Sequence, residues 1–446
     1  SMTASTPNPD ALYAAHIEIL ASRWANSLQA ARFDVAVIGA GSEHIRYGDD
    51  QAIPYVPDPW FVQWTALTQH PGSALVVEPG RRPRLLIWRT NDYWHQPPAL
   101  PGGAQARPFD IEVCDTQAGM TAQTIGLPKR TAWIGDPVQW SQDIEADCIN
   151  PHGVLNPLIW QRAYKTSWEV HCIDQATRRA AAGHAAARAQ LDRTPCEYDI
   201  LRAWLRACRD TERGQPYPPI IALNEHAAVL HYQHYDTVPT APGSLLIDAG
   251  CAMNGYACDI SRTWTRDGSE FAALIGAVDA AQQSLAQAVR PGIAFGELHH
   301  QAHLAIGGVL RDQGLARTDA ATLVERGVTR AFFPHGLGHL LGLQVHDVGG
   351  NLAGPDGERM AAPVEYPHLR LTRTLEPGQI LTIEPGLYFI PALLEPLRAG
   401  PVADTLDWPS IDRLTRFGGV RIEDDVQVTD SGVRNLTREV LSGALS

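Results

Sequence analysis

The chain has 446 residues and a net charge of −13 at pH 7, with 44% hydrophobic and 19% charged residues. This composition is typical of a soluble globular protein, and the length favours two domains. The negative charge argues against nucleic acid or an anionic membrane surface as the main partner, since both require basic patches.

The seven cysteines are scattered and include no Cys-x-x-Cys pair, so neither a zinc ribbon nor a disulfide framework is indicated. The first residues contain no basic segment followed by an apolar stretch, and no apolar run approaches the length needed to span a bilayer. We therefore expect a cytoplasmic protein without a membrane partner.

The N-terminal part of the chain alternates short helical and strand patterns. A helical pattern comes first, at 12–31, and strand patterns follow at 34–39, 73–80 and 84–88. This alternation predicts a small mixed α/β domain over residues 1–160.

The remaining residues, 161–446, form the second predicted domain. Helical patterns are found at 165–190, 198–210, 270–289 and 295–312. Strand patterns are found at 220–223, 228–232, 244–248 and 257–264.

Three histidines, His335, His339 and His346, lie within twelve residues of a stretch interrupted by glycines. Histidine is the commonest side-chain metal ligand and the natural proton carrier near neutral pH. Gly336 and Gly338 allow backbone turns that would clash with a Cβ, so the rings could converge. The alternative is a glycine-rich loop with surface histidines, and the choice depends on whether the chain supplies further ligands.

Two aspartates are predicted to meet across a hairpin. Asp248 ends an apolar strand pattern, Asp259 lies eleven residues later in the next one, and an Asn-Gly turn signal at 254–255 stands between them. Such a turn places their Cβ atoms about 4.5–8 Å apart, where two carboxylates repel unless a cation or a shared proton intervenes. The alternative is that each caps the backbone or pairs with Arg262 or Arg266.

Two glutamates also belong to apolar strand patterns. Glu384 ends the pattern at 380–383, and Glu423 lies inside the pattern at 419–426. Glutamate is rarely buried unless paired, and Arg421 could form a structural salt bridge with one neighbouring acid. Two such glutamates, together with the aspartates and the histidine cluster, indicate a common site.

Four carboxylates and one imidazole exceed what a single tetrahedral zinc would take. Two divalent cations that share bridging carboxylates balance four negative charges best. The oxygen-rich ligand set favours Mn²⁺, and Co²⁺ or Zn²⁺ would also fit. Paired cations about 3.5–4 Å apart can hold a hydroxide and polarise a substrate oxygen, so the expected reaction is metal-assisted hydrolysis.

Five residues resemble, in their order and local sequences, the metal ligands of the pita-bread metallopeptidases: Asp248, Asp259, His339, Glu384 and Glu423. That family includes methionine aminopeptidase, aminopeptidase P and prolidase, and the resemblance covers essentially the whole chain. The segments at 361–370, 384–390 and 417–424 are similar to the bacterial Xaa-Pro dipeptidase (prolidase) branch. The resemblance implies an α+β fold, with a small mixed α/β N-terminal domain and a C-terminal pita-bread domain whose curved antiparallel sheet is backed by helices.

The resemblance also implies a role for each ligand. Asp248 would bind one metal, Asp259 and Glu423 would bridge both, and His339 and Glu384 would complete the second. A metal-bridging hydroxide would attack the scissile carbonyl. Glu384 would act as the general base and then return the proton to the leaving imino nitrogen.

Further residues match the substrate pocket of the family. His346 matches a histidine that contacts the substrate carbonyl, and His335 and His231 match other pocket histidines. Arg421 resembles an arginine held against the metal carboxylates. Tyr217 aligns through weaker local similarity.

Two arginines are candidates for the substrate's terminal carboxylate. Arg373, or in second place Arg370, could clamp it, because the planar guanidinium fits two oxygens. The alternative for both is a solvated strand face.

The resemblance further implies a homodimer in which the N-terminal domain of one subunit closes the site of the other. Asp50 of the partner subunit would then reach the site, although it aligns only through weak local similarity. Exposed aromatic residues near Trp60 and Trp64 would be compatible with such an interface.

The leading expectation is a dinuclear metallopeptidase that cleaves Xaa-Pro dipeptides, with a side activity on organophosphate triesters. An aminopeptidase P acting on longer peptides is an alternative with the same site. A non-catalytic binding paralogue is a third reading, but such proteins usually lose metal ligands, and all five are present here.

Overall fold

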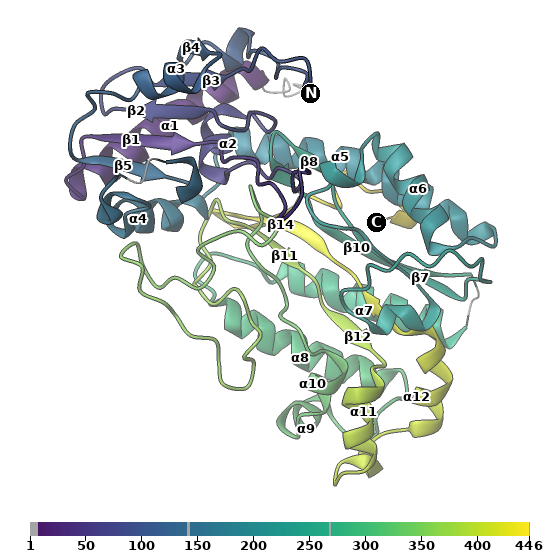
Figure 1. Ribbon diagram of the computed structural model, residues 1–446. Helices are drawn as coiled ribbons and strands as arrows, with labels where there is room; N and C mark the ends of the chain where they lie inside the picture. The colour runs from purple at the N-terminus through teal and green to yellow at the C-terminus, as the bar shows by residue number, and fades with distance from the viewer. Residues whose placement is uncertain (1–7, 141–142, 267–268, 446) are drawn as a thin grey trace, which may run out of the picture. The chain divides into compact units, whose positions relative to one another are not determined.

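The computed structural model describes residues 8–140, 143–266 and 269–445 (Figure 1). The chain forms two compact units. The first holds the described residues up to Cys172 together with Asn254–Tyr256 and Ala353–Glu358. The second holds Ile173–Met253, Ala257–Leu352 and the described residues from Arg359 onwards.

A five-stranded mixed sheet organises the first unit (Figure 1). Its strand order is β4-β3-β2-β1-β5, with antiparallel pairs in the middle and a parallel pair at each edge. The strands are β1 (Val35–Gly39), β2 (Ala74–Val77), β3 (Arg84–Trp88), β4 (Asp110–Cys114) and β5 (Thr131–Ile134). The helices are α1 (Pro9–Ala30), α2 (Pro59–Thr65), α3 (Gln117–Ala122) and α4 (His152–Arg162). The predicted helix at 12–31 and the first three predicted strands are confirmed.

Helices α1, α2 and α4 pack against one face of this sheet. Trp24 of α1 and Leu158 of α4 share one core cluster with the strand residues Ile38 and Leu75. Trp64 of α2 is fully buried in the same cluster, so its predicted exposure is wrong.

Trp60 is only partly buried, and it packs against the same cluster. Its ring also lies edge-on to Trp24, at 5.8 Å between ring centroids. Residues 60 and 64 are one helical turn apart, so both side chains of α2 face the core.

The second unit is built on antiparallel strands in three larger pieces, β10-β7-β6, β11-β14-β15 and β12-β13, with a short pair β8-β9. The first strands are β6 (Ile220–Leu223), β7 (Ser244–Ala249), β8 (Ala252–Met253), β9 (Tyr256–Ala257) and β10 (Ile260–Thr265). The later strands are β11 (Ile380–Ile383), β12 (Gly386–Tyr388), β13 (Gly419–Arg421), β14 (Asp424–Thr429) and β15 (Gly432–Asn435). An isolated bridge between Ser261 and Glu423 joins the first piece to the chain between β13 and β14.

Helices back these strands. They are α5 (Ser167–Ala189), α6 (Glu197–Cys208), α7 (Glu270–Gln287), α8 (Phe295–Asp312), α9 (Ala320–Glu325), α10 (Val328–Phe332), α11 (Pro391–Arg398) and α12 (Trp408–Leu414). Ala180 of α5 and Trp204 of α6 pack on Leu245 of β7. Gln282 of α7 donates to the carbonyl oxygen of Ile383 at 3.2 Å, so α7 lies against β11 (Figure 1). Within the described residues, no helix is both long and apolar enough to cross a membrane.

The predicted strand at 228–232 is wrong. Residues Asn224–Ala228 form a short 3-10 helix, and the chain continues to residue 232 without strand pairing. Other contacts hold this segment: the hydroxyl of Tyr232 donates to the buried carboxylate of Glu197, and the N–H of Tyr232 donates to the carbonyl oxygen of Val229 at 3.2 Å. Side-chain contacts and local turns, rather than a strand ladder, therefore order this segment.

Candidate metal centre

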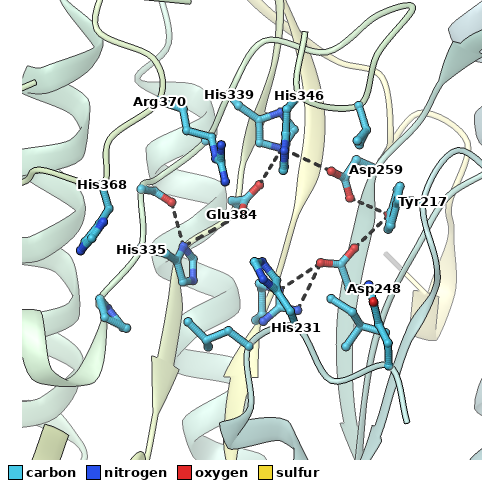
Figure 2. A pocket seen from close by; sticks show the side chains of 18 of the residues that line it. Tyr217, His231, Asp248, Asp259, His335, His339, His346, His368, Arg370 and Glu384 are labelled. Carbon is cyan, nitrogen blue, oxygen red and sulfur yellow. Dashed lines mark hydrogen bonds and ion pairs between the residues drawn. The ribbon is translucent and has the colours of Figure 1, made fainter. Parts of the chain in front are cut away.

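Asp248 and Asp259 come together across an antiparallel strand pair (Figure 2). The partner of Asp248 in β10 is Ser261, so Asp259, two residues earlier, is its diagonal neighbour. The turn between β8 and β9 has positive φ angles of 52° at Asn254 and 85° at Gly255. Positive φ at both central residues is typical of a tight two-residue hairpin, so the predicted turn is confirmed.

Tyr217 and Arg421 hold these aspartates. The Tyr217 hydroxyl lies 2.9 Å from Oδ1 of Asp248 and 2.7 Å from Oδ1 of Asp259. Arg421 approaches Oδ2 of Asp248 with Nη2 at 3.2 Å and Nε at 3.3 Å. The structure thus brings both residues, which the resemblance had suggested, into the centre.

His339 joins three carboxylates at one point. Its Nε2 lies 3.3 Å from Oδ2 of Asp259, 3.3 Å from Oε2 of Glu384 and 4.0 Å from Oε2 of Glu423. One ligand atom from each of these four residues lies within 4.8 Å of the others. Asp248 stands beside this group, linked to Asp259 through Tyr217.

Two of the carboxylates stand at interruptions of the strands. Asp259 precedes β10, and its N–H donates to Oδ2 of the buried Asp425 at 3.0 Å. Glu423 lies between β13 and β14, not inside a strand as predicted. The reason is a change of partner, because β13 pairs with β12 whereas β14 pairs with β11.

Thr382 fixes the geometry between His339 and Glu384. Its Oγ1 accepts a hydrogen bond from the N–H of His339 at 3.1 Å and donates to Oε2 of Glu384 at 2.9 Å. The loop passes so close that a Cβ at Gly338 would lie 1.9 Å from the Thr382 carbonyl oxygen. Sequence reasoning missed Thr382, although strand alternation places it on the same face as Glu384, two residues later.

The charges of this cluster are not balanced by protein groups alone. Burial and the neighbouring Asp259 charge raise the pKa of Asp248 to about 8. Burial and the same neighbour raise the pKa of Glu423 well above its ordinary value. Burial would lower the pKa of His339, but its contacts with Asp259 and Glu384 outweigh burial and raise it well above the ordinary value. Without cations, the cluster therefore retains protons that solvent-exposed groups would lose.

The residues fit divalent cations. Oε2 of Glu423 is buried and receives no hydrogen bond within the described residues, so a donor or a cation is missing at this atom. Carboxylate oxygens with one imidazole nitrogen suit a cation such as Mn²⁺, Co²⁺ or Zn²⁺. One cation could be held by Asp259, His339, Glu384 and Glu423 together. Asp248 could extend the site to a second cation.

A cavity of about 670 Å³ opens over this cluster (Figure 2). Its lining includes His231, His335, His346, His368 and Arg370 as well as Tyr217, Arg421 and three of the acidic residues, Asp248, Asp259 and Glu384. The cavity thus combines candidate ligands with groups that can contact a bound molecule.

The predicted pocket histidines lie at this cavity. His335 interacts through Nε2 with the Tyr388 hydroxyl at 2.7 Å, and its Nδ1 lies 4.0 Å from Oε1 of Glu384. The rings of His346 and His339 are 4.4 Å apart between centroids. Burial lowers the pKa of His335 and of His346 to about 4, so both are neutral at pH 7.

Sequence reasoning missed two further groups. The Tyr388 hydroxyl accepts a hydrogen bond from Nη1 of Arg421 at 3.0 Å, which connects Arg421 to His335. Ser261 donates to Oε1 of Glu423 at 2.8 Å. Ser261 lies two residues after Asp259, so strand alternation could have identified it, whereas no local signal identifies Tyr388.

The two candidate clamp arginines are placed differently. Arg370 is exposed and lines the cavity, whereas Arg373 is 1% exposed and is not among the lining residues. The geometry therefore favours Arg370, the reverse of the predicted order. Asp50 belongs to the first unit, where it is exposed, and its role in a partner subunit stays a prediction.

Comparison with known proteins identifies the family. A model of metallopeptidase family M24 matches residues 171–430, more than half of the chain. The chain belongs to metallopeptidase family M24. A second model, for the N-terminal domain of Xaa-Pro dipeptidases, matches residues 11–160.

The M24 chain has curated relatives of nearly equal length. It is 42% identical over 439 residues to a Xaa-Pro dipeptidase of Stenotrophomonas maltophilia, covering 98% of this chain and 99% of the relative. It is also 42% identical over 440 residues to a Xaa-Pro dipeptidase of Xanthomonas euvesicatoria, with the same coverage. The predicted similarity to the bacterial dipeptidase branch is confirmed.

Solved structures support the fold of the M24 chain. Aminopeptidase PepP of Pseudomonas aeruginosa is similar with a TM-score of 0.71 and 26% identity, covering 98% of this chain and 96% of that one. Proline aminopeptidase P II of Yersinia pestis gives a TM-score of 0.70 at 24% identity, with 97% of each chain covered. The α+β pita-bread fold is therefore confirmed, and the chain is a hydrolase of the metallopeptidase class.

Proposed function

We propose that this metallopeptidase hydrolyses Xaa-Pro dipeptides with two divalent cations held by Asp248, Asp259, His339, Glu384 and Glu423. The observation that carries the proposal is the convergence of four of these residues within 4.8 Å, with the fifth joined through Tyr217. Near-identical length and 42% identity to Xaa-Pro dipeptidases support the substrate class. When bound, the cations would polarise the peptide carbonyl and lower the pKa of water.

Glu384 is the general base in this proposal. Burial would raise the pKa of Glu384, but its contacts with Glu423 and His339 outweigh burial and hold it below the ordinary value. Its carboxylate is therefore ionised at neutral pH and can accept a proton from the attacking water. The hydrogen bond from Thr382 keeps one oxygen oriented while the proton is carried to the imino nitrogen of proline.

The remaining lining residues would bind the dipeptide. His231, His335 and His346 provide hydrogen-bonding groups around the scissile bond, and the neutral rings of His335 and His346 add no charge there. Arg370 would pair with the terminal carboxylate in a planar, two-oxygen contact. Proline has no amide N–H after the peptide bond is made, so recognition must use the carbonyl and the two chain ends.

The test is release of proline from Ala-Pro and Gly-Pro by purified protein with added Mn²⁺. Chelated protein and a Glu384→Gln variant are the controls, since the variant retains the shape of the side chain but cannot accept the proton. Failure of the Mn²⁺-loaded protein to release proline, with Co²⁺ and Zn²⁺ also inactive, would refute the proposal.

A second candidate is an aminopeptidase P activity on longer peptides. The cavity over the metal centre shares His335 and His368 with a neighbouring cavity of about 400 Å³, which offers room for residues beyond proline. Comparing Ala-Pro with Ala-Pro-Ala at equal concentration separates the two activities. Faster cleavage of the tripeptide would replace the dipeptidase proposal.

We also propose a side activity on organophosphate triesters, because a water activated for attack on carbon can also attack phosphorus. A nitrophenyl triester provides the assay, and no turnover above the chelated control would remove this proposal.

Three further parts of the proposal are the cation, the assembly and the compartment. Elemental analysis after purification from cells would identify Mn²⁺ or replace it. The proposed homodimer predicts a sedimentation mass of twice 48.6 kDa, with activity lowered by Asp50→Ala. The cytoplasm is the compartment we expect, and cell fractionation would check it.

A further inference from the structure

A buried carboxylate outside the metal centre accepts hydrogen bonds from four donors. Glu197 is the first residue of α6, and it is 1% exposed. Its oxygens accept hydrogen bonds from the N–H groups of Leu223 and Asp236, from Nδ1 of His226 and from the hydroxyl of Tyr232. All four donors belong to residues 223–236, the segment that was wrongly predicted to contain a strand.

The two carboxylate oxygens of Glu197 accept hydrogen bonds from different parts of the segment. Oε2 accepts from Leu223 at 2.9 Å and from His226 at 2.8 Å, both before His231. Oε1 accepts from Tyr232 at 2.7 Å and from Asp236 at 3.0 Å, both after His231. One carboxylate therefore holds the two sides of the segment together.

The enclosed part of the segment forms one wall of the cavity. Leu230, His231 and Gln233 line it (Figure 2 labels His231). His231 itself is exposed, and no strand pairing restrains residues 229–232. The stacked rings of His226 and Tyr232, 4.5 Å apart between centroids, stand on the side of Glu197.

Two other side-chain hydrogen bonds hold the outer parts of the segment. Oδ1 of Asn224 accepts a hydrogen bond from the N–H of Gly243 at 2.7 Å, and the hydroxyl of Tyr235 donates to the carbonyl oxygen of Pro219 at 2.6 Å. Neither of these two contacts joins the part before His231 to the part after it. A backbone hydrogen bond from the N–H of Tyr232 to the carbonyl oxygen of Val229, at 3.2 Å, closes the turn around His231. Glu197 connects the longer flanks of that turn, through two donors on each side.

We propose that Glu197 is a positioning residue for substrate binding, which acts by fixing the segment 223–236 so that His231 faces the bound dipeptide. The proposal rests on the proposed function, since it assigns His231 to the substrate wall. It concerns the placement of substrate and not the retention of cations.

Glu197→Gln is a sharp test because the amide offers one acceptor oxygen in place of two. Tyr232 and His226 can reverse their hydrogen bonds, since a hydroxyl and a neutral imidazole can each accept. The backbone N–H groups of Leu223 and Asp236 can only donate. Whichever way the amide turns, its NH₂ group therefore faces one of these N–H groups, and one side of the segment is released.

The experiment compares Glu197→Gln with Glu225→Gln, the same substitution at an exposed position in the same segment. Full-length proteins are loaded with Mn²⁺, and cation content, kcat and KM for Ala-Pro and hydrogen exchange are measured. Glu197→Gln should exchange faster over 223–236, retain its cations and raise KM, with kcat/KM lower by about tenfold, because small displacements of binding groups are costly. Glu225→Gln should match the wild type in all four measurements.

A double variant separates positioning from general loss of stability. If Glu197 acts through His231, then adding Glu197→Gln to His231→Ala should lower kcat/KM by no more than about twofold further, since effects within one unit are not additive. Tyr232→Phe, which removes one donor and keeps the ring, should show a smaller rise in KM of the same kind. It provides the test if Glu197→Gln does not fold.

Several results would overturn the proposal. The first is an unchanged KM in Glu197→Gln or, if that variant does not fold, in Tyr232→Phe. The second is full additivity of Glu197→Gln with His231→Ala. The third is a loss of cations in the variant that equals its loss of activity. A wild-type protein that releases no proline would instead refute the proposed function, and this inference with it. An active wild type with an unchanged variant would refute the role of Glu197 alone.

Discussion

The different roles proposed for His339, as a cation ligand, and for His346, as a substrate-facing group, provide the most direct test of the metal centre. Nε2 of His339 lies 3.3 Å from oxygens of both Asp259 and Glu384, which is the position of a shared ligand. His346 contacts the ring of His339 but has no ion pair with the acidic residues among those that the structure describes. We therefore expect His339→Ala to lose cations and His346→Ala to keep them.

The magnitude follows from the linkage between binding and folding. A cation present at 100 times its Kd stabilises the native state by about 2.7 kcal/mol. Loss of groups that only support a ligand typically weakens metal affinity by about 10- to 100-fold, and loss of a ligand should cost at least the upper value. At the same cation concentration, the stabilisation in His339→Ala would then fall to RT ln 2, about 0.4 kcal/mol.

The assay is urea unfolding of each protein with Mn²⁺ and with chelator, together with cation content by elemental analysis. The difference between the two curves isolates the cation, because any effect of the mutation on the metal-free protein cancels. His346→Ala should keep the wild-type difference of about 2.7 kcal/mol while its turnover falls. Equal loss of cations in both variants would refute the assignment of His339 as ligand and His346 as substrate-facing group.

Three other predictions concern a hydrogen bond, a backbone approach and a buried histidine. Thr382→Val should lower kcat about tenfold with KM unchanged, because the orienting bond to Glu384 is lost, whereas Thr382→Ser should retain activity; equal kcat in both variants would contradict this. Gly338→Ala should abolish cation binding, since its Cβ would lie 1.9 Å from a carbonyl oxygen, whereas Gly276→Ala, in open space on α7, should be tolerated; a Gly338→Ala protein that keeps its cations would refute the argument. Burial lowers the pKa of His184 to about 3, so between pH 6.5 and 3 the unfolded chain binds a proton that the folded chain does not. This group should therefore lower the free energy of unfolding by about 1.4 kcal/mol per pH unit on acidification. In His184→Gln the midpoint of urea unfolding should change less between pH 7.5 and 5.5 than in the wild type, and an equal change in both proteins would contradict this prediction.

Features with local causes could be predicted from the sequence. The Asn-Gly turn specifies where Asp248 and Asp259 meet, because few other residues adopt positive φ without strain. The strand that precedes Glu384 is also visible in the sequence, because three of its four buried residues, Ile380–Ile383, are large and apolar.

Features that depend on distant partners could not be predicted. The segment at 228–232 has the apolar composition of a strand, but much of its order comes from Glu197 of α6, which is distant in the sequence. Whether Arg370 or Arg373 faces the cavity depends on how the chain packs in three dimensions, and no local pattern states it. The break of strand pairing at Glu423 arises because two separate partners, β12 and β11, meet there.

The Tyr217 hydroxyl has one proton and two carboxylate neighbours, Asp248 and Asp259. If it donates to Asp259, the oxygen of Asp248 beside it must bring a proton of its own, which agrees with the raised pKa of Asp248, about 8. Loading the site with cations is then an exchange in which protons leave as metal enters. Below pH 8 each loading event should acidify a weakly buffered solution, and the apparent metal affinity should rise with pH, so metal uptake by this protein would follow the acidity of its surroundings.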